Sequence, residues 1–182
     1  MNLVIIAGSA RTASLSSRVA TYLAQYFSTE FPTHTTTLVD VRKYELPFVQ
    51  KPFTSLETTP TAWQPLAECM FGADAFILVS PEYNGGYSPA MKNLLDHFPS
   101  FPRKPFGIVT SSPGALGGMR AAQHMQQLVT GFGGILCPTM LIVPMVDKKF
   151  SETNELLDDT FTKTITRFTS EFMWLAETIT TK

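Results

Sequence analysis

Cysteine is scarce in this sequence of 182 residues, and the scarcity excludes two kinds of site. Its two cysteines, Cys69 and Cys137, lie beside or within apolar stretches and form no Cys-x-x-Cys pair. A disulfide framework or a thiolate metal site needs more cysteines at close spacing, and no His and Cys residues stand at ligand spacing either. We therefore expect buried thiols in a reducing compartment and no metal site.

Charge is also sparse, and its two signs are balanced. Lys and Arg number 14 and Asp and Glu number 15, so the formal net charge is -1. A near-neutral chain has no general attraction for nucleic acid or an anionic membrane. No apolar run reaches the length of a membrane span, and the run after Asn2 is too short for a signal peptide. We expect a soluble, cytoplasmic protein without nucleic-acid or membrane partners.

Short apolar runs recur along the chain and predict the strands of a parallel sheet. A continuous apolar run is typical of a strand buried on both faces, and β-branched residues favour strands in general. Five segments have one of these properties: residues 3–7, 35–39, 75–79, 106–110 and 135–143. Pro138 indicates that the early part of the fifth segment lies at an edge or is irregular.

Amphipathic segments lie between these runs and predict the helices. They span residues 14–27, 63–71, 89–98, 119–130 and 151–180. Pro89 suits a first helical turn, and Ser151 is expected to cap the last helix. Residues 40–61 contain several prolines and no clear period, so we predict a long connection with room for a short helical turn.

This alternation is typical of one α/β domain over residues 1–182, with a doubly wound parallel sheet. A chain of this length with 44% hydrophobic residues can bury a substantial core. Ligands of such sheets bind at the carboxyl ends of the strands, near the point where the strand order reverses. The loops at 8–16, 80–88 and 111–118 follow the first, third and fourth strands, so we expect them to meet there.

The first of these loops has the composition of a phosphate site. Its sequence, Gly8-Ser9-Ala10-Arg11-Thr12-Ala13-Ser14-Leu15-Ser16, combines hydroxyls with a guanidinium at a helix N-terminus. Amides and the helix dipole favour an anion there, and many donors suit a phosphate monoester. The glycine patterns of dinucleotide and nucleoside triphosphate sites are both missing. The alternative is a plain strand-to-helix turn with Ser14 as N-cap.

The other two loops suit a flat ligand. Gly85 and Gly86 allow a close approach, while Tyr83 and Tyr87 suit a wall for a ring. The loop 111–118 ends at a helix N-terminus, whose amides stabilise negative charge. Each loop alone also fits a plain connection, the second as a hairpin-like turn. Together at one sheet edge they favour a ligand.

Three motifs in these loops resemble the NADPH-dependent FMN reductases, which include chromate-, quinone- and azo-dye-reducing flavoproteins. The motifs are Gly8-Ser9-x-Arg11-x-x-Ser14, Pro81-Glu82-Tyr83-Asn84-Gly85-Gly86-Tyr87-Ser88-Pro89-Ala90-Met91-Lys92-Asn93-Leu94-Leu95-Asp96, and Gly117-Gly118-x-Arg120-Ala121. Their order and spacing agree with the family over residues 3–145, and the middle motif is highly specific. The resemblance implies a flavodoxin-like three-layer sandwich, with a five-stranded parallel sheet of order 2-1-3-4-5 and helices on both faces.

The resemblance also implies FMN as cofactor, NADPH or NADH as electron donor, and a set of site residues. The FMN phosphate would be held by Ser9, Arg11, Ser14 and Ser16. The ring would be lined, largely through backbone atoms, by Pro81, Glu82, Tyr83, Asn84 and Gly85, and closed on its other side by Ser111, Gly114, Gly117 and Gly118. Two positions depart from the family, which often has Asn at Ser16 and Trp at His97.

The expected function is an oxidoreductase that works by ping-pong transfer from NAD(P)H through FMN to a quinone, flavin, azo compound or metal oxyanion. Hydride transfer needs no side-chain acid or base, so no catalytic residue is predicted and His97 is expected to be structural or at an interface. The family implies a homodimer or homotetramer. Alternatives are a flavodoxin-type carrier, which the net charge of -1 disfavours, and an FMN-free relative. Arg120 suits an NADPH phosphate, an interface ion pair or plain solvation.

Overall fold

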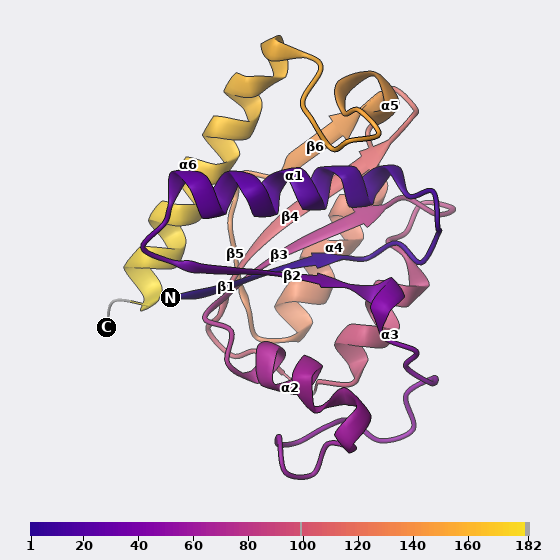
Figure 1. Ribbon diagram of the computed structural model, residues 1–182, viewed down its shortest axis with the longest axis vertical. Helices are drawn as coiled ribbons and strands as arrows, with labels where there is room; N and C mark the ends of the chain where they lie inside the picture. Colours follow the sequence, from indigo (N-terminus) through magenta and orange to yellow (C-terminus); the bar gives the residue numbers. More distant parts are fainter. Residues whose placement is uncertain (99, 181–182) are drawn as a thin grey trace.

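The computed structural model describes residues 1–98 and 100–180, and Figure 1 shows its elements around a central sheet. The strands are β1 (Asn2–Ala7), β2 (Thr35–Asp40), β3 (Ala75–Pro81), β4 (Pro105–Ser112), β5 (Ile135–Leu136) and β6 (Leu141–Pro144). The helices are α1 (Leu15–Glu30), α2 (Gln64–Phe71), α3 (Pro89–Asp96), α4 (Met119–Gly131), α5 (Val146–Lys149) and α6 (Thr162–Thr180). Short 3-10 turns lie at Val41–Lys43, Thr61–Trp63 and Asp159–Phe161.

The sheet is parallel and has the predicted order, β2-β1-β3-β4-β5. The predicted fifth strand, 135–143, is divided into two. β5 pairs with the start of β4 at Pro105 and Phe106, and β6 pairs with its end from Val109 to Ser112. The interruption contains Pro138, which has no amide hydrogen to donate to a ladder. The sheet therefore has six strands in the described part of the chain, and the predicted fold class is confirmed.

Helices cover both faces of the sheet (Figure 1), and the sheet separates the buried side chains into two cores. α1 and α6 pack on one face through Val19, Leu23, Phe27, Phe168 and Phe172. α2, α3 and α4 pack on the other through Leu66, Met70, Leu94, Met125 and Val129. β1, β3 and β4 are buried on both faces, which explains their continuous apolar sequences.

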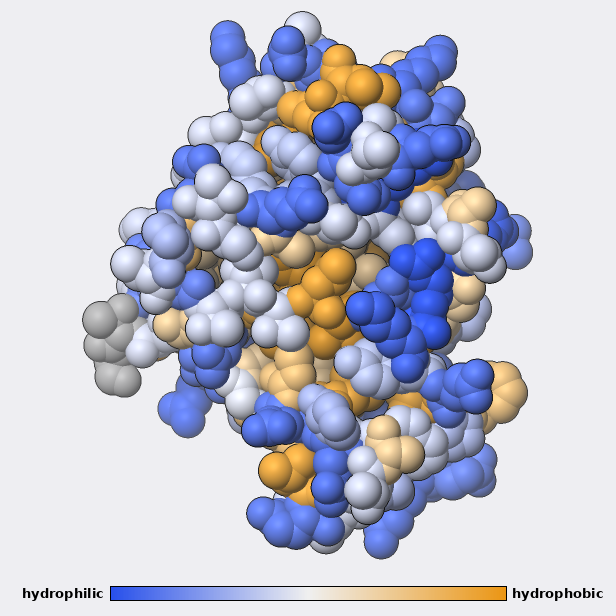
Figure 2. Space-filling model, viewed as in Figure 1, coloured by the Kyte–Doolittle hydropathy of each residue, from blue (hydrophilic) through white to orange (hydrophobic). Residues whose placement is uncertain are grey.

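The surface in Figure 2 is mainly hydrophilic, with smaller hydrophobic areas in the middle of the view and near its top. Within residues 1–98 and 100–180, no helix combines the length and the apolar character needed to cross a membrane.

The predicted last helix, 151–180, is wrong over its first third. α6 begins at Thr162, and residues 151–161 form turns instead. An isolated antiparallel bridge joins Phe150 to Leu156, and the Ser151 hydroxyl accepts from the amides of Thr153 (3.2 Å) and Glu155 (3.0 Å). Ser151 therefore stabilises a local turn and does not cap a helix, because short polar side chains also favour turns.

The connection 40–61 contains the short helical turn Val41–Lys43, and a buried aromatic group fixes its middle. The Phe53 ring lies 5.9 Å from that of Trp63 and 5.0 Å from that of His97. The Phe53 amide donates to the His97 carbonyl at 2.6 Å, and His97 Nδ1 donates to the Asn93 carbonyl at 2.8 Å. His97 is 2% exposed and attaches this connection to the end of α3, which ends at Asp96 and not at Phe98 as predicted.

Candidate functional site

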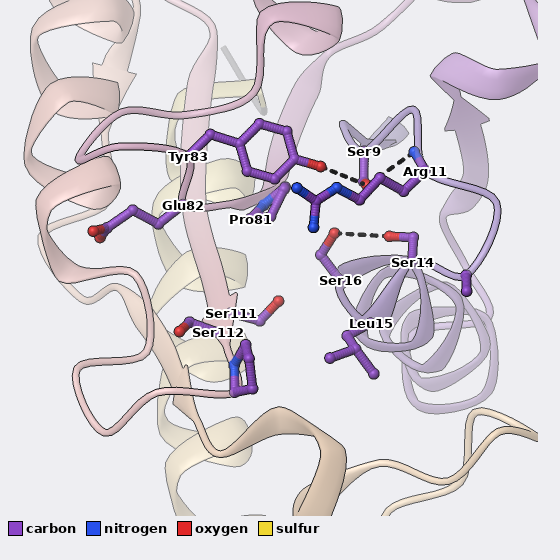
Figure 3. A pocket seen from close by; sticks show the side chains of 12 residues that line it. Ser9, Arg11, Ser14, Leu15, Ser16, Pro81, Glu82, Tyr83, Ser111 and Ser112 are labelled. Carbon is purple, nitrogen blue, oxygen red and sulfur yellow. Dashed lines mark hydrogen bonds between the residues drawn. The ribbon is translucent and has the colours of Figure 1, made fainter.

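A cavity lies at the carboxyl edge of the sheet, where the loops after β1, β3 and β4 meet (Figure 3). The three loops approach one another there because β1, β3 and β4 are neighbours in the sheet. The cavity is lined by Ser9, Arg11, Ala13, Ser14, Leu15, Ser16, Pro81, Glu82, Tyr83, Ser111, Ser112 and Pro113. The predicted meeting of the three loops is therefore observed.

The first loop presents hydroxyls and amides at the start of α1. The Ser14 hydroxyl caps the helix by accepting from the Ser17 amide at 3.1 Å, and it lies 3.1 Å from the Ser16 hydroxyl. Helix geometry leaves the first amides of α1, at Leu15 and Ser16, without an intrahelical acceptor. The plain-turn interpretation is correct about the cap, but the capped turn still directs donors into the cavity.

Arg11 and Tyr83 connect the first loop to the second across the cavity. The Arg11 guanidinium carbon lies 4.5 Å from the centre of the Tyr83 ring, a cation–π distance. The hydroxyls of Tyr83 and Ser9 are 3.4 Å apart. Figure 3 shows the Tyr83 ring directed toward Arg11, whereas the carboxylate of Glu82 points the other way. Ring and guanidinium thus form one wall of the cavity.

A tight turn from Tyr83 to Gly86 forms the outer part of the second loop. The two residues exchange backbone hydrogen bonds of 2.8 and 3.0 Å. Asn84 (φ 51°) and Gly85 (φ 86°) occupy the left-handed region, as a type I′ turn requires. Asn and Gly tolerate these angles best, which explains the Asn-Gly pair in the sequence.

Two buried serines fasten the second loop to the sheet. The Ser88 hydroxyl donates to the Gly8 carbonyl and accepts from the Met91 amide at 3.1 Å as the N-cap of α3. The Ser80 hydroxyl accepts from the Ser88 amide at 3.0 Å. A Cβ at Gly8 would lie 2.8 Å from the Met91 Cβ, so β1 and α3 can approach this closely only with glycine there.

The third loop offers one hydroxyl to the cavity and uses its glycines for packing. The Ser111 hydroxyl is buried and has no partner within residues 1–98 and 100–180, and Figure 3 shows it directed into the cavity. The Ser112 hydroxyl accepts from the Gly114 amide at 2.9 Å. Gly117 (φ 61°) and Gly118 (φ 90°) lie against β6 and Thr110, where a Cβ would come within 3.0 Å of its neighbours.

An ion pair at the end of β2 supports the first loop from outside. Arg42 donates from Nε to Asp40 Oδ1 at 2.9 Å and from Nη1 to the Thr12 carbonyl at 3.1 Å. Burial favours the neutral carboxyl, but hydrogen bonds from the Arg42 side chain and amide outweigh it and hold the pKa of Asp40 below its ordinary value. The phosphate-type loop is thereby tied to β2.

Most of the predicted site residues come together, and the rest lie just outside the lining. Eight of them line the cavity: Ser9, Arg11, Ser14, Ser16, Pro81, Glu82, Tyr83 and Ser111. The other five are Asn84, Gly85, Gly114, Gly117 and Gly118, which shape the neighbouring turns. The sequence prediction missed four lining residues, Ala13, Leu15, Ser112 and Pro113. All four lie within the predicted loops 8–16 and 111–118, so their position in the sequence could have indicated that they line the cavity.

The cavity has the chemistry of an anion and ring site. Serine hydroxyls and a guanidinium surround the start of α1, where the helix dipole also favours negative charge. The buried Ser111 hydroxyl, which has no partner in the part of the chain that the structure describes, marks a position where a polar ligand atom would supply a hydrogen bond. Among the described residues, no three His, Cys, Asp or Glu side chains gather as metal ligands. The donor set therefore fits a phosphate ester joined to a polar chain and a ring.

Arg120 lies outside the cavity and forms an ion pair within the chain. Its Nη2 is 2.6 Å from Glu82 Oε1 and its side chain is 66% exposed. The sequence analysis offered an NADPH phosphate, an interface ion pair or plain solvation for Arg120, and it did not predict an ion pair with Glu82.

The comparisons with known proteins agree with this geometry. A sequence model of the NADPH-dependent FMN reductase family matches residues 1–148. An FMN-dependent NADPH-azoreductase of Staphylococcus aureus is 32% identical over 149 residues, which cover 76% of this chain and 74% of that protein.

Solved structures share the fold at lower sequence identity. The flavoenzyme NAD(P)H:(acceptor) oxidoreductase of Paracoccus denitrificans superposes with a TM-score of 0.80 at 18% identity, covering 98% of each chain. An NADH:FMN oxidoreductase in its apo form gives 0.71 at 14% identity, covering 100% of this chain and 91% of that one. The family match, the relative in Staphylococcus aureus and the shared fold together identify the chain as a member of the NADPH-dependent FMN reductase family, in which FMN is the cofactor and NADPH the electron donor.

Proposed function

We propose that this chain is a cytoplasmic oxidoreductase that passes electrons from NAD(P)H, through bound FMN, to a small-molecule acceptor in a ping-pong sequence. The acceptor would be a quinone, a free flavin, an azo compound or a metal oxyanion. The cavity formed by the loops after β1, β3 and β4 carries the proposal, because its donors fit FMN. The relative in Staphylococcus aureus, an FMN-dependent NADPH-azoreductase, supports the choice of electron donor and of acceptor class.

The first loop would hold the FMN phosphate. Ser9, Ser14 and Ser16 supply hydroxyls and Arg11 supplies a fork of N–H donors beside them. A phosphate monoester carries close to two negative charges, and charge-assisted hydrogen bonds to it are the strong ones. The amides and the dipole of α1 add to the same attraction.

The second and third loops would hold the ring between them. Pro81, Glu82, Tyr83, Asn84 and Gly85 would line one side, and Ser111, Gly114, Gly117 and Gly118 would close the other. The Ser111 hydroxyl is buried and has no hydrogen-bond partner within residues 1–98 and 100–180, so it would be available to the ring. Asn84 and Gly85 are the two positive-φ residues of the turn, and they would contribute to the ring site through backbone atoms.

When bound, FMN supplies the hydride and electron chemistry of such an enzyme. The chain then has to bind FMN, to orient it and to limit the access of water to it. Tyr83 and Pro113 wall the cavity, while the paired Asp40 and Arg42 stiffen the phosphate loop from behind. No side chain needs to move a proton for hydride transfer itself.

The alternative function is a flavodoxin-type electron carrier that docks to protein partners. Such carriers use strong acidity to steer toward basic partners, and a net charge of -1 offers little steering. We further propose that the whole chain, 1–182, acts as one FMN-binding domain and assembles as a homodimer or homotetramer, which is what the resemblance to the family implies.

Two measurements test the proposal. The purified protein should show a flavin absorbance band, or should bind added FMN, and anaerobic NADPH should bleach that band in a stopped-flow experiment. A flavin that stays oxidised when NADPH is added would favour the carrier. Failure to bind FMN would contradict both functions.

A further inference from the structure

Glu82 belongs to the second loop but turns its carboxylate away from Arg11 and Ser16 (Figure 3). Its Oε1 accepts from Arg120 Nε at 2.9 Å and from Arg120 Nη2 at 2.6 Å. Its Oε2 accepts from the amide of Ala121 at 3.4 Å. The Glu82 side chain is 13% exposed, so its charge is mostly shielded from water and depends on these partners.

The N-terminus of α4 needs an external cap, and Glu82 provides it. The N-cap residue, Gly118, has no side chain and makes no capping hydrogen bond. Ala121 is the third residue of α4, and its amide is one that an N-cap side chain would normally satisfy. A carboxylate also interacts favourably with the positive end of the helix. The cap of α4 thus comes from another loop, because Glu82 lies 36 residues before the N-cap position Gly118.

The turn Tyr83–Gly86 rests on the same part of α4. A Cβ at Gly85 would lie 3.9 Å from the guanidinium carbon of Arg120, and a Cβ at Gly86 would lie 3.8 Å from His124 Nδ1. Arg120 therefore lies along the turn while it pairs with Glu82. The contact joins the second loop to the helix that follows the third loop.

We propose that Glu82 is a positioning residue: through Arg120 and the amide of Ala121, it fixes the spacing between the turn Tyr83–Gly86 and the loop 111–118. This inference rests on the proposed function, since it is between these two loops that the FMN ring would lie. Glu82 would act on the ring site through its neighbours and would leave the phosphate site unchanged. The ring-binding geometry is then set by an ion pair between Glu82, whose carboxylate turns away from Arg11 and Ser16, and Arg120, which lies outside the cavity.

The test compares FMN with riboflavin, which has the same ring but no phosphate. In Glu82→Ala, the dissociation constants of both should rise by the same factor, about tenfold for the loss of a charged hydrogen-bond group. Flavin fluorescence on titration reports both constants without any turnover. Glu82→Gln, which keeps an acceptor for Ala121, should recover part of the loss.

A double-mutant cycle tests whether Glu82 works through Arg120. Arg120→Ala should weaken both ligands in the same direction, and the double variant should be no worse than Glu82→Ala, because coupled residues are not additive. Glu152→Gln is the matched control. Glu152 pairs loosely with Arg18 at 3.6 Å and is 92% exposed, so this variant should bind both ligands like the unsubstituted chain.

Several results would overturn the proposal. Unchanged dissociation constants of FMN and riboflavin in Glu82→Ala would overturn this inference and leave the proposed function standing. A loss of affinity confined to FMN would do the same, because it would locate the effect at the phosphate. Opposite shifts of the flavin midpoint potential in Glu82→Gln and Arg120→Ala, with unchanged affinities, would mean that the pair acts by charge and not by position. Absence of flavin binding in the unsubstituted chain would contradict the proposed function as well. If Glu82→Ala does not fold, Glu82→Gln and Arg120→Lys supply the same comparison.

Discussion

The loops after β1 and β3 reach the same edge of the sheet but use their polar groups in opposite ways. Ser9, Arg11 and Ser16 of the first loop face a cavity. In the second loop, Ser88 bonds to the Gly8 carbonyl and Glu82 bonds to α4. Polar groups that the fold leaves available indicate ligand binding, whereas polar groups that the fold satisfies indicate structure. Substitution of Arg11 or Ser16 in the first loop should therefore act mainly on FMN affinity, whereas substitution of Ser88 in the second should act mainly on stability.

Ser88→Ala should have the largest effect, on the free energy of unfolding. The substitution removes the N-cap of α3 and leaves the buried Gly8 carbonyl without a donor. Together these should cost about 3 kcal/mol. Urea unfolding of the FMN-free protein measures it. A loss below about 0.5 kcal/mol would remove the distinction between the two loops.

Arg11→Ala should have the next largest effect, on FMN affinity. A charged hydrogen bond to phosphate contributes about 2 kcal/mol, so the dissociation constant should rise about 30-fold. Riboflavin affinity should change much less, and the unfolding free energy without ligand should stay within about 0.5 kcal/mol. Unchanged FMN affinity would show that the phosphate binds elsewhere.

Ser14 and Ser16 separate the two roles inside one loop. Ser14 caps α1, so Ser14→Ala should lower the unfolding free energy by about 1 kcal/mol as well as weaken FMN binding. Ser16 caps nothing, so Ser16→Ala should affect FMN affinity alone. Thermal unfolding and fluorescence titration of both variants check this. Equal loss of stability in the two variants would argue that Ser16 is structural.

The smallest effect should be the contribution of Asp40 to the pH dependence of the free energy of unfolding. Its pKa in the fold lies below the ordinary value of 3.8 because Arg42 holds the charged form. A lowered pKa stabilises the folded state at pH values above the ordinary pKa of the carboxyl. This contribution to the free energy of unfolding is lost as the pH falls through the lowered pKa. Urea unfolding between pH 5 and pH 2.5 should therefore show a shallower acid loss in Asp40→Asn than in the unsubstituted chain. Parallel curves would contradict the assignment.

The central fold could be predicted because its signals are local. β1, β3 and β4 are buried on both faces, so their sequences are continuous apolar runs that end at the loops. The position of the cavity followed from that arrangement, because parallel strands present their loops at one edge. The composition of the first loop pointed to Arg11, and the resemblance to the family added individual residues such as Ser111.

Other features depend on contacts that no local pattern encodes. The bridge from Phe150 to Leu156 prevents an early start of α6, although the sequence there is compatible with a helix. The capping of α4 by Glu82 joins residues that are far apart in the chain. Leu15 lines the cavity because of the direction in which α1 leaves the loop. Such features need the tertiary structure.

The division of the fifth strand has a consequence for behaviour at high concentration. A long unpaired strand edge is a template on which another molecule can add its own strand. Beyond β4 this edge consists of β5, with 2 residues, and β6, with 4, and Pro138 lies between them while Pro144 ends β6. Neither piece offers a continuous ladder of donors. The interruption therefore protects this side of the sheet against edge-to-edge aggregation.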